Sequence, residues 1–106
     1  MNVVSSGTQT ATISTKHQLF TTSLANTYAL IVDTSNMAIG DVVELYVDVA
    51  CKSAGTHRQA YLVVFAHVQA DPAKLSVPVV SPYGATFHLK QSAGTGRGFD
   101  WCVVGL

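Results

Sequence analysis

The sequence predicts an all-β protein whose strands form a two-sheet β-sandwich of jelly-roll type. Apolar and polar residues alternate over much of the chain, which is the pattern of strands with one face in a core. Stretches rich in glycine, proline, serine and asparagine recur about every 8 to 12 residues. At 106 residues the chain has the length of one domain. We therefore expect a single β-sandwich domain over residues 8–106, preceded by an N-terminal arm over residues 1–7.

The N-terminal part of the chain is expected to hold this arm and an edge strand. Val3 and Val4 give the arm too little apolar surface to fold back on the domain, but enough to dock on a neighbouring protein. We therefore expect residues 1–7 to become ordered only in an assembly. The first strand is expected over residues 8–14, where many hydroxyl side chains indicate the edge of a sheet.

The clearest alternation lies in the middle of the chain. A second strand is expected over residues 28–34 and a third over residues 41–51, where the odd positions from Val43 onward are apolar. The polar residues Glu44 and Asp48 then share the opposite face of this third strand. One face of the strand is therefore expected in the core and the other outside it.

A longer segment, residues 58–70, permits either a helix or a strand. Its stiff valines and two aromatic residues favour a strand, and apolar residues on both faces indicate that it is buried on both. Shorter strands are expected over residues 75–80, 86–91 and 99–104. The connecting loops carry residues that favour turns and are expected at 35–40, 52–56, 71–74, 81–84 and 93–98.

The composition narrows the classes of function. Six basic and six acidic residues give a formal net charge of zero, whereas a nucleic-acid-binding protein needs a basic surplus. No apolar run approaches the roughly 20 residues that span a bilayer, and the N-terminus lacks the features of an export signal. Only 11% of the residues are charged, which favours a protein that functions within an assembly. We expect neither nucleic acid nor a membrane as a partner.

No catalytic, metal-binding or cofactor-binding pattern is found. The four histidines lack ligand spacing to one another or to a cysteine. The six carboxylates are interpreted as polar caps of strands. The GTGRG stretch at residues 94–98 lacks the spacing and the following helix of a dinucleotide fingerprint, so we interpret it as a hairpin loop. The sequence therefore predicts a protein that is not an enzyme and that needs no metal or cofactor.

Two cysteines, Cys51 and Cys102, are too few for a disulfide scaffold and lack CxxC spacing. Because a free cysteine behaves as a small apolar residue, the favoured interpretation is two unpaired thiols buried in strands. A single bridge between them stays open as the alternative.

Two blocks of the sequence carry a resemblance: NMAIGDVVELYVDVACKSAGTHRQAYLVVFAHVQ, residues 36–69, and SPYGATFHLKQSAGTGRGFDW, residues 81–101. They resemble a family of small proteins encoded among the virion structural genes of tailed bacteriophages. The resemblance extends over about residues 10–104. Ala85 and Thr86 stand where such relatives tend to carry a bulky aromatic residue and an acid, so no contact residue is carried over from the family.

The resemblance implies a capsid cement or decoration protein with a jelly-roll sandwich. Such a protein is made in the host cytoplasm, binds the outside of the head and stabilises contacts between major capsid proteins. We expect it to act as a homo-oligomer, a dimer or trimer, on the shell. Many repeated contacts on an icosahedral shell make modest affinity per copy sufficient.

A candidate contact surface comes from two loops that share an Ala-Gly-Thr core followed by an arginine. The basic residues beside these loops are Lys52 and Arg58 for one and Lys90 and Arg97 for the other. If hairpins bring both loops to one end of the sandwich, the four side chains form a basic rim suited to acidic patches on the major capsid protein. The alternative is two ordinary hairpin turns with solvated charges.

Two other functions fit the same composition. One is a tail, collar or fibre component of the virion. The other, from a different class, is a carbohydrate-binding module in which exposed Tyr46, Tyr83 and Trp101 stack on sugars.

Overall fold

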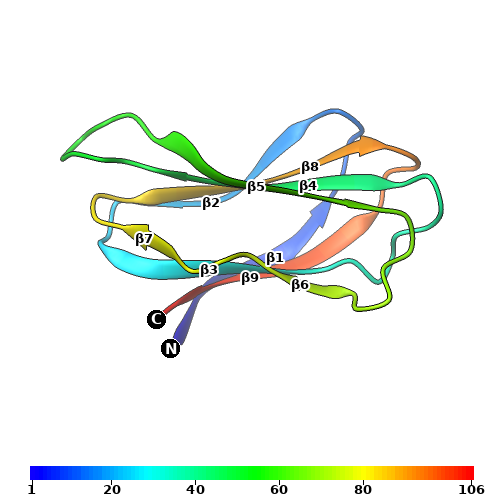
Figure 1. Ribbon diagram of the computed structural model, residues 1–106, viewed down its shortest axis with the longest axis horizontal. Helices are drawn as coiled ribbons and strands as arrows, with labels where there is room; N and C mark the ends of the chain where they lie inside the picture. Colours follow the sequence, from blue (N-terminus) through cyan, green and yellow to red (C-terminus); the bar gives the residue numbers. More distant parts are fainter.

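The computed structural model describes residues 1–106 and consists of two antiparallel β-sheets packed as a β-sandwich (Figure 1). One sheet has the strand order β1-β9-β3-β6, with β7 also paired to β3, and the other has the order β2-β8-β4-β5. The strands are β1 (Asn2–Thr10), β2 (Lys16–Thr22), β3 (Asn26–Asp33), β4 (Val42–Val49), β5 (Arg58–Ala66), β6 (Ala73–Leu75), β7 (Val79–Ser81), β8 (Ala85–Ala93) and β9 (Gly98–Gly105). The predicted all-β class and the two-sheet sandwich are confirmed.

The core lies between the two sheets and follows from the alternation. In β4 the side chains of Val43, Leu45 and Val47 are fully buried, as predicted. Leu45 and Val47 sit in register with Leu89 and Phe87 of β8, which are also fully buried. Each such side chain contributes about 1.5–3 kcal/mol by leaving water. Inward residues of β3 and β9 complete the core from the other sheet.

Predicted strands that have a regular period are found close to the expected bounds. The segments expected at 28–34, 41–51, 86–91 and 99–104 correspond to β3, β4, β8 and β9. No helix in the chain is long and apolar enough to cross a bilayer.

The N-terminal prediction is wrong in its bounds, because β1 begins at Asn2 and not at residue 8. It pairs with β9 from Asn2 opposite Gly105 to Thr10 opposite Gly98, and it forms the edge of its sheet as expected. Residues 2–7 are therefore part of a sheet and do not form a free arm. Backbone pairing, and not burial of Val3 or Val4, holds them, since both side chains are exposed.

Strand β2 was not predicted. It pairs with β8 at the edge of the four-stranded sheet, and its register shifts between Gln18 and Phe20. This irregularity interrupts the alternation of inward and outward residues, and that alternation is the pattern from which a strand is predicted.

The segment predicted as a strand buried on both faces is instead an edge strand, β5, and it ends at Ala66. Tyr61, Val63 and Phe65 pack against the core, while Leu62 and Val64 point outward and are 43% and 52% exposed. Because β5 has a neighbour on one side only and no layer above it, its outer face stays open.

The single strand predicted at residues 75–80 is two short strands, β6 and β7, separated at Ser76–Pro78. Pro78 has no N–H to donate to a ladder. The Ser76 hydroxyl takes over part of the pairing with β3, because it accepts a hydrogen bond from the backbone N–H of Leu30 at 2.9 Å.

The two cysteines are unpaired, but they are not buried in strands as predicted. Cys51 lies two residues beyond the end of β4 and is exposed, and Cys102 is half-buried on the outward face of β9. The expected burial of Cys51 failed because β4 ends at Val49.

Candidate functional site

The connection between β4 and β5 carries two of the predicted contact residues, Lys52 and Arg58. A tight turn shapes it: the backbone N–H of Gly55 donates to the carbonyl of Lys52 at 2.9 Å. Ala54 adopts a left-handed backbone with φ of 55°. In Figure 1 this loop extends beyond the sheets at one end of the sandwich.

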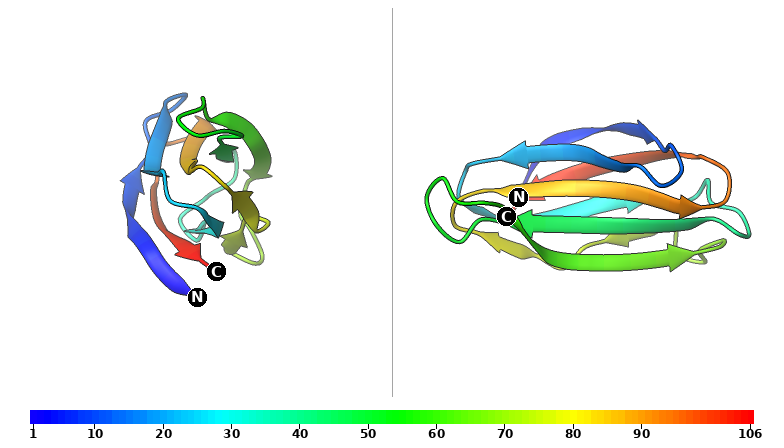
Figure 2. Two further views of the ribbon diagram at one scale, coloured as in Figure 1. Left: turned by 90° about the vertical axis from the view of Figure 1, so that its left-hand side faces the viewer. Right: turned by 90° about the horizontal axis from the view of Figure 1, so that it is seen from above.

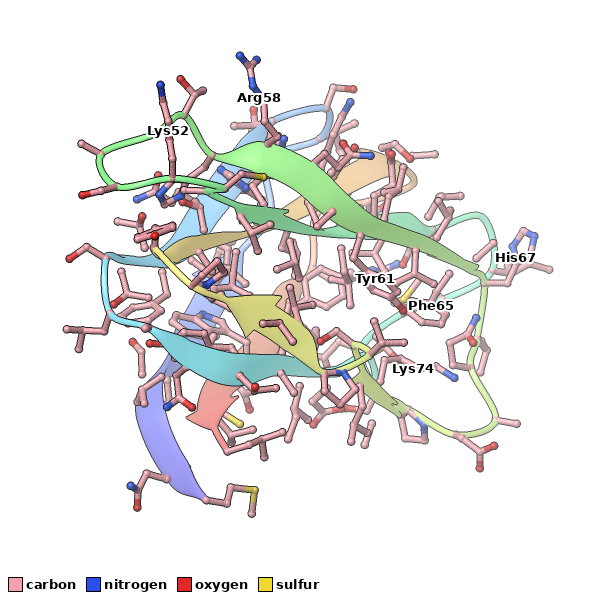
Figure 3. All side chains as sticks on the ribbon, turned by 60° about the vertical axis from the view of Figure 1, so that its left-hand side comes forward. Lys52, Arg58, Tyr61, Phe65, His67 and Lys74 are labelled. Carbon is pink, nitrogen blue, oxygen red and sulfur yellow. The ribbon has the colours of Figure 1, made fainter.

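This loop encloses an open hollow of about 340 Å³. Its lining is Cys51, Lys52, Gly55, Thr56 and Arg58. Figure 3 shows the side chains of Lys52 and Arg58 directed outward from the loop and from the start of β5. No carboxylate lines the hollow, and neither of the two ion pairs in the chain includes Lys52 or Arg58. We call this surface the basic loop, defined by Lys52 and Arg58.

The basic loop is fixed to the sheet beneath it. His57 Nδ1 and the Thr86 hydroxyl lie 2.7 Å apart, and Thr86 also shares a 2.9 Å hydrogen bond with Thr21. These contacts tie the loop to β8 and β2. The two cations are thus displayed from an anchored connection, which reduces the conformational entropy lost when a partner binds.

Arg97 lies at the opposite end of the sandwich, so the predicted basic rim does not form. Strand β8 starts beside the end of β4, with Ala85 opposite Val49, and ends beside its start, with Ala93 opposite Val42. The β8–β9 loop that carries Arg97 therefore lies far from the basic loop (Figure 1).

Arg97 also has a partner within the chain. Its Nε donates to Oδ2 of Asp41 at 2.8 Å, and the Asp41 side chain is only 2% exposed. The backbone N–H groups of Ala38 and Thr95 donate to the same carboxylate at 2.8 and 3.1 Å. Burial pushes the pKa of Asp41 upward, but these hydrogen bonds and the charge of Arg97 outweigh it, so the pKa lies below its usual value. Arg97 is thus a structural residue, a role that sequence reading missed.

Lys90 lies in a third place, on the outer face of the four-stranded sheet. It is in register with Lys16 on one side and Glu44 on the other. Lys16 Nζ sits 4.3 Å from the ring centroid of Tyr46, whose hydroxyl donates to Glu44 at 2.7 Å. That hydrogen bond raises the pKa of Tyr46. Lys90 therefore borders a polar network in the sheet and is separate from the basic loop.

The remaining predicted contact residues, Val3 and Val4, are exposed near the start of β1. They lie at the same end of the sandwich as the basic loop but on the other sheet (Figure 1). Of the six predicted contact residues, the fold brings Lys52 and Arg58 together, places Val3 and Val4 at the same end, and separates Lys90 and Arg97 from them.

The aromatic residues named for sugar stacking are mostly covered. Tyr46 is buried beneath Lys16, and Trp101 packs against the core opposite Gly7 of β1. Only Tyr83 is exposed.

The surface has one more hollow. A shallow hollow of about 250 Å³ lies on the outer face of β3 and β9, lined by Ile31, Asp33, Asp100, Trp101 and Cys102. No three His, Cys, Asp or Glu side chains converge as a metal site would require.

Comparisons with family models, with curated proteins and with solved structures give no match to this chain.

Proposed function

We propose that this chain is a non-enzymatic structural protein of a tailed-bacteriophage virion, a cement or decoration protein on the outside of the head. In this role it binds major capsid proteins, as a homo-oligomer, and stabilises the contacts between them. The sequence resemblance over about residues 10–104 supports the proposal. A rigid sandwich that displays exposed loops and strand edges also suits a protein that links neighbours.

We also propose that the sandwich is of jelly-roll type. If β6 and β7 are counted as one interrupted strand, each sheet has four strands. The chain crosses between the sheets at the β1–β2, β2–β3, β3–β4, β5–β6, β7–β8 and β8–β9 connections. Repeated crossing of this kind supports the two Greek keys of a jelly roll.

The basic loop is the observation that best supports a contact with the head. Lys52 and Arg58 are two of only six basic residues, and neither has an acidic partner within the chain. A capsid surface patch of carboxylates supplies the missing partners, with Arg58 able to form forked hydrogen bonds. Each exposed pair contributes about 0 to 1 kcal/mol, so binding depends on many copies and on both residues together.

The proposal is tested by reversing both charges in Lys52→Glu/Arg58→Glu and measuring occupancy on purified heads by electron microscopy. We expect the double variant to be stripped from the shell, because like charges then meet. Lys90→Glu is the control, since it reverses a charge outside the basic loop, and it should retain most of the occupancy.

Two outcomes contradict the proposal. Full occupancy of the double variant would show that the basic loop does not contact the head. Density for the wild-type chain only at the tail or at one vertex would make it a tail or collar component.

A further inference from the structure

The sandwich has four edges, and three of them are protected against pairing with another chain. Natural sheets protect edges with charges, prolines, short strands or bulges. Strand β2 has its register shift in the middle, between Gln18 and Phe20, so that neither regular stretch is longer than three residues. Strands β6 and β7 are three residues each and directly follow Pro72 and Pro78. Strand β1 has a register shift between Val3 and Ser5, and its regular remainder from Ser5 to Thr10 contains a glycine and polar residues but no apolar side chain.

Strand β5 has no such protection over most of its length. It is nine residues long and pairs only with β4, and Figure 2 (right) shows it as the outer margin of its sheet. From Gln59 to Ala66 it contains no charged residue, no proline and no glycine. Its one register shift lies near its start, so the stretch from Tyr61 to Ala66 is regular.

The outward side chains of β5 are also apolar. Leu62 and Val64 are 43% and 52% exposed, and the exposed Ala60 and Ala66 flank them on the same face. An edge with free backbone groups and an apolar face is a template for a further strand. Both the backbone and the side chains of β5 therefore indicate a docking surface.

We propose that β5 binds β5 of a second copy in antiparallel orientation, across a two-fold axis, to give a homodimer. The two four-stranded sheets then join into one continuous sheet. With Val63 on the axis, Leu62 of one copy faces Val64 of the other on the outer face, and Tyr61 faces Phe65 on the inner face. Every facing pair from Ala60 to Ala66 is then apolar. In each pair the two side chains lie on the same face of the joined sheet.

Charge favours a second copy as the occupant. The paired stretch is uncharged and each copy has a formal net charge of zero, so two copies meet without repulsion. Lys74 of β6 lies beside this edge, and its Nζ is 5.0 Å from the ring centroid of Phe65 (Figure 3). It thus covers an aromatic ring of the inner layer and leaves the outer side chains free.

Symmetry also favours self-pairing. Identical antiparallel strands satisfy each other's free N–H and C=O groups, and the dimer closes because both β5 edges are used. Pairing of β5 with β1 of another copy would leave a free edge at each end and would extend into a fibre. The dimer does not require a phage head and is tested on the purified chain.

The experiment measures the mass of the purified chain by sedimentation velocity over a range of concentrations. We expect the wild type to dimerise reversibly and Val64→Lys to remain monomeric at the same concentrations, because a lysine blocks the edge. Val80→Lys is the matched control: Val80 is an outward valine, 71% exposed, on a strand of the other sheet. It should dimerise as the wild type does. Circular dichroism and cooperative unfolding verify that each variant is folded.

Cross-linking tests the register without a charged substitution. In a Cys51→Ser/Cys102→Ser background, mixed Leu62→Cys and Val64→Cys chains should form a disulfide, while each alone should form far less. A monomeric wild type, an unchanged Val64→Lys dimer, fibres, or equal cross-linking of the single variants would each overturn the proposal. A chain that is monomeric alone but bound to heads through β5 would assign this edge to the capsid protein instead.

Discussion

Asp41 is the residue on which one end of the sandwich depends. Its carboxylate receives hydrogen bonds from Ala38 in its own loop and from Thr95 and Arg97 in the β8–β9 loop. Its carbonyl accepts a hydrogen bond from the N–H of His67, just beyond β5, at 2.8 Å. One buried acid therefore joins three connections that are distant in sequence.

Replacing Asp41 by asparagine should destabilise the protein in a pH-dependent manner. The variant loses hydrogen bonds to a charged acceptor, which lowers the free energy of unfolding by about 2 kcal/mol near neutral pH. Because folding lowers the pKa of Asp41, its contribution is complete above the unfolded value of 3.8 and is lost as pH falls through the folded value. Urea unfolding of wild type and Asp41→Asn should thus show a difference that narrows in acid. A constant difference would contradict the charged role of this carboxylate.

Gly94 and Gly40 form a matched pair for testing the packing around Asp41. Both have φ of 91°, a left-handed backbone that disfavours alanine by about 1 kcal/mol. A Cβ atom at Gly94 would overlap Asp41, whereas one at Gly40 meets nothing within 4 Å. Gly94→Ala should therefore cost about 2 kcal/mol more than Gly40→Ala in the free energy of unfolding. Equal losses in urea unfolding would show that the loop shifts freely.

At the scale of elements, the sequence predicts strands well where one face is buried and the ladder is regular. Strand β4 meets both conditions, and its inward residues Val43 and Leu45 were assigned correctly. Strand β2 does not meet the second condition, because a bulge interrupts its ladder. Strand β5 fails in another way: Leu62 and Val64 look like core residues in sequence, but only tertiary position decides that their face is open.

Only part of the candidate site could be predicted from the sequence, for a similar reason. Arg58 and Arg97 follow the same Ala-Gly-Thr stretch, so local sequence treats them alike. The fold separates them, because the two loops emerge at opposite ends of β4 and β8. The presence of Asp41 beside Arg97 depends on pairing across 56 positions of sequence, and no local pattern reports that contact.

Strand β1 is held by its backbone, and this can be tested by deletion. Removing residues 2–7 should lower the free energy of unfolding by several ladder hydrogen bonds, each contributing about 1 kcal/mol net. Trp101, the single tryptophan, lies opposite Gly7 and should shift its fluorescence to longer wavelength as it meets water. The double variant Val3→Ser/Val4→Ser keeps the backbone and should unfold nearly as the wild type does. A deletion without effect on unfolding would restore the interpretation of these residues as an arm that lies outside the folded domain.

At the scale of the whole molecule, the two proposals join in one geometry. The chain is elongated, with extents of 42 × 26 × 19 Å. The basic loop lies at one end of the sandwich (Figure 1). Because β5 pairs antiparallel with its copy, a dimer carries its two basic loops at opposite ends. Such a dimer presents two separated basic contacts and suits the linking of neighbouring capsid proteins.

This geometry predicts that dimerisation strengthens binding to heads through bivalency. Val64→Lys leaves Lys52 and Arg58 intact, yet it should bind heads with an apparent affinity lower by about 10² or more, since each copy then binds alone. Occupancy on purified heads as a function of free protein concentration measures this, with Val80→Lys as the control that retains the dimer. Raising the salt concentration should release the monomeric variant before the wild type, because exposed ion pairs are screened and a single contact has no second one to hold it. If Val64→Lys occupied heads as well as Val80→Lys does, the basic loop would bind one copy at a time and the dimer would have no part in the contact.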